Sequence, residues 1–482
     1  MRDFTERVFG RAKDLKATYA DLRIVKNTSE RINVRNGVVS SITSNTDEGF
    51  GVRVIANGAW GFASSPRIDE AEIDEIVARA VRIARASSMH RKDSVALSEE
   101  DIVSDATYST AHTRDPLNIR LEEKVDLLLQ ADKLMRVGEE IRSTNSVMGI
   151  TRQDKTFASS EGSFIEQDLL ETGALIQATA VAKGDAQVRS YPNGRSGAFR
   201  TGGFEVIDEL DLVGSAEEVG KEAVDLVQAD QCPSLEGDLI LHGNQLGLQI
   251  HESIGHPIEL DRVLGSEVGM AGASFLTTDK LGQLKYGSDI VNVVADATAP
   301  GGMGTFGYDD EGVPAQRASI IKDGQFEGYL SSRETASEIG QRSSGAALAT
   351  NWNKIPLVRM TNINLEPGDW DLDELIRDTK RGIMMEGTKT GSIDDMRVNF
   401  QFGPEVAWEI EDGSIKRMLK NPVYTGSSLG FWRSCDAVAG SEHWDMWGTP
   451  TCGKGQPGQV AHVGHGAAPA RFRDIRIGVG KW

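Results

Sequence analysis

The chain has 482 residues, a length that predicts two domains rather than a single hydrophobic core. Its net charge of −20 argues against a nucleic-acid partner, because an acidic surface repels phosphate groups. The sequence shows no apolar run of 18 residues and no apolar leader, and its three widely spaced cysteines fit a reducing compartment, so we expect a cytoplasmic protein without membrane association.

Residues 1–230 read as an N-terminal α+β domain. An amphipathic helix at the start of the chain is followed by short strands, with hairpin turns at Asn36-Gly37 and Asn57-Gly58. Three further helices are expected at residues 69–87, 121–137 and 216–229. We predict that the helices pack on an antiparallel or mixed sheet.

Residues 231–482 read as a second domain, because the Pro- and Gly-containing stretch 231–237 interrupts the pattern. Asp323-Gly324 and Asp412-Gly413 each separate two alternating apolar runs, which indicates antiparallel hairpins. Helices are few here. The fold class that we predict is therefore α+β, with a C-terminal, mostly antiparallel β domain that carries one functionally important helix.

That helix contains the sequence "HESIGH", in which His251 and Glu252 are followed by His256. The H-E-x-x-x-H spacing is one residue longer than the zinc-hydrolase signature H-E-x-x-H. Residues i and i+5 diverge on a regular α-helix, so a shared metal requires a local π-type turn, and Gly255 and Pro257 favour such a distortion. Because this string also arises by chance, two ordinary helix histidines are the alternative. We expect the helix to begin near Gln245.

A catalytic zinc needs a third protein ligand from elsewhere in the chain. Cys452 lies in the glycine-rich stretch "TCGKGQPGQ", where Lys454 would favour its thiolate. Cys232 and Cys435 have settings more typical of packed thiols. Two further histidines are rival ligands, although we expect them to face substrate or to be structural: these are His462 and His465.

Four segments in this order resemble the TldD/PmbA family, and specifically its catalytic, TldD-like members. The resemblance covers the whole chain and is far more specific than the histidine spacing alone. The segments are "HESIGHPIELDRVLG", "YDDEGVPAQRASIIKDGQFEGYL", "PLVRMTNINLEPG" and "TCGKGQPGQ".

The resemblance implies a zinc peptidase in which His251, His256 and Cys452 bind Zn2+. It assigns Glu252 as the catalytic carboxylate, and we expect it to activate a zinc-bound water. The implied substrates are unfolded or leader-type peptides in an extended conformation. The implied partner is a PmbA/TldE-like subunit in a heterodimer, or a second copy in a homodimer.

Two other functions fit the same residues. One is a non-peptidase zinc amidohydrolase. The other is a peptide-binding module with a structural zinc, which would need a fourth protein ligand such as His462 or His465. The sequence itself specifies neither the peptide, nor the bond that is cut, nor endo- or exopeptidase action.

Overall fold

Two long antiparallel hairpins build the sheet of the N-terminal half. The computed structural model describes residues 1–91, 93–194, 197–270, 272–455 and 458–478. The strands of the hairpins are 17 to 19 residues long, which corrects the prediction of short strands. They continue through polar segments because β1 is hydrogen-bonded to β2 on one side and to β5 on the other.

The turns of this sheet follow the sequence prediction. Asn36 and Gly37 both have positive φ, 53° and 76°, the conformation that fits a two-residue hairpin to the twist of its strands. Asn57-Gly58 repeats this geometry between β2 and β3. The strand order is β3-β2-β1-β5-β6-β4, with β7 and β8 also paired to β6.

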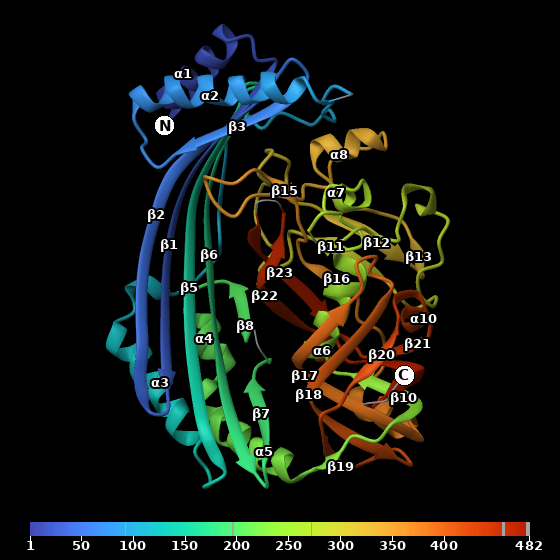
Figure 1. Cartoon of the computed structure of the whole chain (residues 1–482). Helices are drawn as coiled ribbons and strands as arrows, with labels where there is room; N and C mark the ends of the chain where they lie inside the picture. Colours follow the sequence, from blue (N-terminus) through green and yellow to red (C-terminus); the bar gives the residue numbers. More distant parts are fainter. Residues whose placement is uncertain (92, 195–196, 271, 456–457, 479–482) are drawn as a thin grey trace.

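Helices cover the two ends of the long strands, and each end has its own apolar core. Helices α1 and α2 pack on one end, and α3, α4 and α5 on the other (Figure 1). The elements of this half are α1 (Arg2–Asp14), β1 (Tyr19–Arg35), β2 (Val38–Ala56), β3 (Ala59–Ser65), α2 (Glu70–Ser88), β4 (Ala106–Ser109), α3 (Leu121–Leu134), β5 (Ile141–Ser159), β6 (Phe164–Ala182), β7 (Asp185–Tyr191), β8 (Ala198–Thr201), α4 (Glu205–Leu210) and α5 (Leu212–Gln228).

The C-terminal half is built on a second, mostly antiparallel sheet of order β17-β10-β24-β20-β18-β19-β9. Because β17 also pairs with β18, the strands from β17 to β18 close into a ring. Both predicted Asp-Gly hairpins are present, between β12 and β13 and between β18 and β19.

A smaller sheet and several short hairpins surround the ring. The four-stranded sheet has the order β13-β12-β11-β16, and β22 and β23 form a separate hairpin. The elements are β9 (Asp230–Gln231), β10 (Leu235–Leu241), α6 (Gly243–Ile250), α7 (Leu260–Val263), β11 (Val293–Asp296), β12 (Arg317–Lys322), β13 (Gln325–Phe326), α8 (Arg333–Glu338), β14 (Ala347–Leu348), β15 (Leu357–Val358), β16 (Ile363–Leu365), α9 (Leu372–Asp378), β17 (Arg381–Ile393), β18 (Asn399–Glu411), β19 (Ser414–Lys420), β20 (Tyr424–Ser427), α10 (Ser428–Arg433), β21 (Cys435–Val438), β22 (Asp445–Lys454), β23 (Gln459–Ala467) and β24 (Ala470–Ile477).

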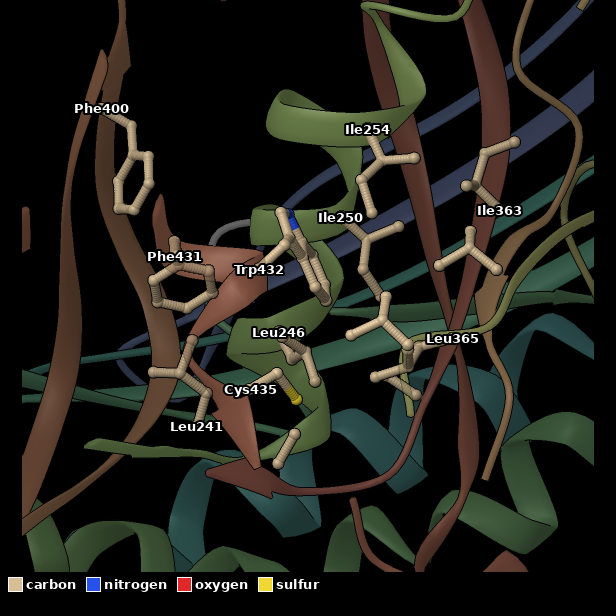
Figure 2. Packing of buried hydrophobic residues seen from close by; sticks show 14 of the residues in the cluster. Leu241, Leu246, Ile250, Ile254, Ile363, Leu365, Phe400, Phe431, Trp432 and Cys435 are labelled. Carbon is tan, nitrogen blue, oxygen red and sulfur yellow. The ribbon is translucent and has the colours of Figure 1, made fainter. Parts of the chain in front are cut away.

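Helix α6 and the π-helical turn His251–Gly255 that continues it lead into the histidine motif, and both lie in the main core of the C-terminal half. Leu246 and Ile250 of the helix and Ile254 of the turn are fully buried. Figure 2 shows them between Trp432 on one side and Ile363 on the other. Such burial fixes the helix from several directions, so the polar side chains that it carries have defined positions.

Buried ion pairs connect the two halves. Arg53 of β2 pairs with Asp21 at 2.7 Å and with Glu311 at 3.0 Å, and Lys155 of β5 pairs with Asp310 at 3.0 Å. Asp310 and Glu311 belong to the "YDDEG" segment, so two of its three acids form ion pairs in the junction between the halves. Breaking such a pair leaves an uncompensated buried charge, so the junction resists separation.

The architecture confirms the predicted α+β class, with N-terminal helices on a largely antiparallel sheet and a β-rich C-terminal half. The division into domains 1–230 and 231–482 stays a prediction. None of the helices in the described ranges has the length and apolar character that crossing a bilayer requires.

Candidate metal centre

The two motif histidines are brought together by one π-helical turn, His251–Gly255, that follows α6. The backbone N–H of His256 donates to the carbonyl of His251 at 3.1 Å, an i→i+5 bond. The ring centroids of the two histidines are 4.8 Å apart. The predicted distortion is therefore confirmed, and the extra residue in the motif is absorbed by the turn.

Two local details differ from the prediction: where the helix begins, and why a glycine is present at position 255. Helix α6 begins at Gly243 rather than near Gln245, because Asn244 lies inside the helix and its Oδ1 accepts from the Gly387 N–H at 3.1 Å. Gly255 is required for space: a Cβ there would lie 2.3 Å from Sδ of Met360.

Ser253 connects the π turn to the surrounding core. Its Oγ donates to the carbonyl of Gln249 at 2.5 Å and accepts from Nε1 of Trp432 at 2.8 Å. The hydroxyl of Tyr286 donates to the backbone carbonyl of Ser253. A serine that bonds back to the i−4 carbonyl bends a helix, and the two aromatic partners hold the bend from outside.

Cys452 completes the group from a distant hairpin. It lies on β22, and its Sγ is 3.8 Å from Nε2 of His256. One ligand atom from each of His251, His256 and Cys452 lies within 4.8 Å of the other two, and all three residues are buried. Among the described residues, no fourth His, Cys, Asp or Glu atom joins this group.

The other two cysteines lie outside the group. Burial raises the pKa of the Cys232 thiol and of the Cys435 thiol to about 12 in each case. Figure 2 shows Cys435 among the apolar core residues. Both are therefore packed, protonated thiols, as the sequence predicted.

Each motif histidine is oriented through its Nδ1 atom. Nδ1 of His251 lies 2.8 Å from Nε2 of His465, and Nδ1 of His256 lies 2.9 Å from Oε2 of Glu259. Burial, together with the neighbouring His256 and His465, holds the pKa of His251 well below its usual value. Burial also lowers the pKa of His465 to about 3. These two imidazoles are therefore neutral, the form in which a histidine binds a metal.

Glu259 is a residue of this centre that the sequence analysis missed. Its only signal was its place three residues after His256 in the same motif. Burial alone would raise the pKa of Glu259, but Lys454, His256 and Arg262 outweigh it and hold this pKa well below the usual value. The carboxylate is therefore ionised beside His256.

Lys454 has a different role from the predicted one. Its Nζ lies 2.6 Å from Asp261 and 3.4 Å from Glu259, and its side chain is fully buried. The lysine charge is therefore paired with two carboxylates. Residues 456–457 of the glycine-rich stretch lie outside the described residues.

Glu252 points to a different partner from the histidines that flank it. Its Oε2 accepts a hydrogen bond from Nη1 of Arg397 at 2.7 Å, and its side chain is 23% exposed. Arg397 lies between β17 and β18. The sequence did not indicate this contact, because Arg397 is 145 residues from Glu252 in the chain. Glu252 is thus the accessible carboxylate of the motif, and Glu259 the buried one.

A cavity of about 330 Å³ lies between the N-terminal sheet and the C-terminal half. Lys155 and Glu171 line it from β5 and β6, and Arg359 and His462 line it from the C-terminal half. Nδ1 of His462 is 2.5 Å from Oε2 of Glu171, so the two halves also meet through this pair. Of the two late histidines, His465 therefore contacts His251, and His462 faces the cavity.

Comparisons with known proteins show which family the chain resembles along its length. The models for PmbA/TldA metallopeptidase domain 1, central domain and C-terminal domain match residues 20–84, 114–229 and 236–478. A metalloprotease from Methanocaldococcus jannaschii is 33% identical over 453 residues, covering 94% of this chain and 95% of that protein. A zinc metalloprotease TldD homolog from Saccharolobus solfataricus is 23% identical, covering 97% of this chain and 98% of that protein.

The fold is also shared with a solved structure. TldE from Thermococcus kodakarensis superposes on this chain with a TM-score of 0.75 at 16% sequence identity. The superposition covers 99% of this chain and 100% of the TldE chain. The family models span most of the chain, and the Methanocaldococcus jannaschii relative aligns along nearly all of it. The chain therefore belongs to the TldD/PmbA family of metallopeptidases.

Proposed function

We propose that this metallopeptidase is a zinc-dependent peptidase whose metal is held by His251, His256 and Cys452. The observation that carries the proposal is the buried group of three ligand atoms within 4.8 Å of one another, formed by residues from two distant segments. Catalytic zinc sites use three protein ligands and keep one position open, whereas structural sites are closed by four. The relative from Saccharolobus solfataricus is named a zinc metalloprotease, which supports the choice of metal.

The donor set fits zinc chemically. Two imidazoles and a thiolate are nitrogen and sulfur ligands that zinc prefers, and zinc bond lengths place such a pair of ligand atoms roughly 3.5 Å apart. The 3.8 Å between Sγ of Cys452 and Nε2 of His256 is close to this spacing. His465 and Glu259 bond to the Nδ1 atoms of the two histidines, an arrangement that fixes ring orientation around a metal.

The residues of the chain then have distinct tasks. When bound, zinc would supply a Lewis acid that polarises the peptide carbonyl and acidifies a water molecule. Glu252 would act as the general base, taking a proton from the attacking water and passing it to the leaving amine. Arg397 holds the Glu252 carboxylate in one orientation. A carboxylate that lies next to a ligand in sequence and is partly exposed is suited to this task.

We infer that the substrate is an unfolded or leader-type peptide bound in an extended conformation. The β-rich C-terminal half offers strand edges to which an extended chain can add. The shared fold with TldE supports a related subunit as the partner in a heterodimer, with a second copy of the chain as the alternative. A non-peptidase amidohydrolase and a peptide-binding module stay as the competing functions.

The decisive experiment compares Glu252→Gln with wild type on an unstructured peptide library. We expect the variant to keep its zinc and to lose turnover by about 10²- to 10⁴-fold. Turnover at the wild-type rate would contradict the general-base role. Cleavage of small amides but not of peptides would favour the amidohydrolase instead.

The ligand assignment has its own test. Cys452→Ser should lower the zinc content measured by elemental analysis, with Cys232→Ala as the matched control, since Cys232 lies outside the group. Full zinc occupancy in Cys452→Ser would contradict the third ligand. A fourth protein ligand detected by X-ray absorption would favour the structural-zinc alternative.

A further inference from the structure

The cavity between the two halves adjoins the candidate metal centre. Arg359, which lines it, donates from Nη2 to the backbone carbonyl of Cys452. Ala461, which also lines it, is the cross-strand partner of Cys452 in the β22–β23 hairpin. A molecule in this cavity is therefore separated from the metal ligand Cys452 by no more than these side chains and the hairpin backbone.

The basic side chains that line the cavity differ in whether they have an acidic partner. Lys155 is neutralised by Asp310 at 3.0 Å, and His462 lies against Glu171 at 2.5 Å. In the part of the chain that the structure describes, Arg359 has no such acidic partner. It is 1% exposed, and among the described residues no hydrogen-bond acceptor contacts its Nε or its Nη1.

A buried cation without an acidic partner is unusual. Buried charges in proteins are normally paired and hydrogen-bonded, because leaving water costs free energy that only a partner offsets. In a chain with a net charge of −20, acidic residues are abundant, yet none pairs with Arg359 in the described part of the chain. Two of its nitrogens therefore keep hydrogen-bond capacity that the described residues do not use.

We propose that this cavity recognises a carboxylate group of the substrate peptide and that Arg359 is the residue that binds it. The inference rests on the proposed peptidase function, because a peptide brings carboxylates in two places. One is the free C-terminus, and its recognition would make the enzyme trim peptides from that end. The other is an Asp or Glu side chain, and its recognition would select acidic sequences. Arginine is the residue best suited to either, because it stays charged when buried.

The test measures peptide binding without turnover. Zinc-loaded Glu252→Gln protein is titrated with fluorescent versions of one peptide: with a free C-terminus, with a C-terminal amide, and with an internal Glu replaced by Gln. We expect one of the two neutralised peptides to bind about 10- to 100-fold more weakly, the usual effect of losing a charged hydrogen bond. Weakening by the amide identifies the C-terminus, and weakening by Gln identifies the side chain.

Arg359 is tested in the same background. Arg359→Gln should abolish the discrimination between the charged and neutral peptides, and Arg359→Lys should retain part of it. Arg317→Gln, at a half-exposed position outside the cavity, is the control that should leave the discrimination intact. Zinc content and melting temperature establish that each variant is folded.

Two results would overturn the inference. Equal affinity for all three peptides in the Glu252→Gln background, or discrimination that persists in Arg359→Gln, would remove the carboxylate role while leaving peptidase function intact. Failure to bind any of the peptides would instead count against the proposed function as well.

Discussion

Nη1 of Arg397 lies 2.7 Å from Oε2 of Glu252, and this arginine is held in a left-handed backbone conformation with φ of 64°. Few side chains other than glycine, Asn and Asp adopt that conformation, and it persists only where the surroundings impose it. Here the Ser428 hydroxyl donates to the Arg397 carbonyl at 2.7 Å, and the Arg397 N–H donates to the carbonyl of Asp394 at 2.9 Å. The loop is thus built to present one guanidinium to one carboxylate.

Arg397 should therefore act as a positioning residue for Glu252. We expect Arg397→Met to lower kcat by about 10²-fold with little change in KM, because the carboxylate loses its orientation but the substrate contacts persist. Arg397→Lys should recover part of the rate, since it keeps the charge. Steady-state kinetics on a zinc-loaded enzyme provide the measurement, and an unchanged kcat in Arg397→Met would contradict the role.

Glu259 should control how tightly the metal is held. Replacing it with glutamine removes the charge that orients His256, and we expect about a 10- to 100-fold loss of zinc affinity in a chelator competition assay. Asp261→Asn is the matched control, because Asp261 shares Lys454 with Glu259 but contacts neither histidine. Equal losses in the two variants would mean that the lysine pair, rather than the histidine contact, sets the affinity.

The π turn should depend on the hydroxyl of Ser253. Ser253→Ala leaves Nε1 of the buried Trp432 without its acceptor, which should cost about 1–3 kcal/mol in the free energy of unfolding. It should also weaken zinc binding, because the turn that joins the two histidines relaxes. Ser146→Ala is the control: that serine is fully buried, and its hydroxyl has no hydrogen-bond partner among the described residues. Chemical denaturation and metal titration measure the two effects separately, and a Ser253→Ala chain as stable as Ser146→Ala would refute the role.

The contact between His462 and Glu171 predicts a pH dependence of stability. Burial lowers the pKa of His462, but the Glu171 carboxylate raises it more, so the net pKa lies above the ordinary value. The pair therefore stabilises the fold fully below the unfolded-state pKa of about 6.5, and this contribution is lost as the pH rises through the raised pKa.

Melting temperatures of wild type and Glu171→Gln should thus differ most near pH 6 and converge towards pH 9. Glu166→Gln, which removes an exposed carboxylate from the same strand, should show no such trend. A difference that stays constant across this range would contradict the assignment.

The sequence predicted best those features that depend on residues close together in the chain, namely the π turn and the hairpin turns. The five-residue interval between His251 and His256 required a π turn, and the turn is present because a regular helix cannot place both rings together. The Asn-Gly and Asp-Gly pairs located the hairpins because those residues tolerate positive φ. Strand length was missed because polar residues in β1 are held by ladders on both sides rather than by burial.

Partners contributed by distant segments could not be inferred from the chain alone. Arg397 reaches Glu252 only once the β17–β18 hairpin is folded, and nothing in the composition of that hairpin marks it. Lys454 was assigned to the neighbouring thiol because sequence proximity was the only guide, whereas two buried acids compete for it in space. The partners of these two charged side chains are therefore set by contacts between distant segments, which a local sequence pattern does not specify.

The distance along the chain between the members of the metal group bears on when the enzyme becomes active during its synthesis. His256 and Cys452 are 196 residues apart in the chain. A nascent chain that ends between His256 and Cys452 carries both histidines but not the thiol. The proposed hydrolytic centre therefore cannot form until synthesis has passed Cys452, so a shorter nascent chain, an unfolded peptide itself, does not yet carry a complete centre.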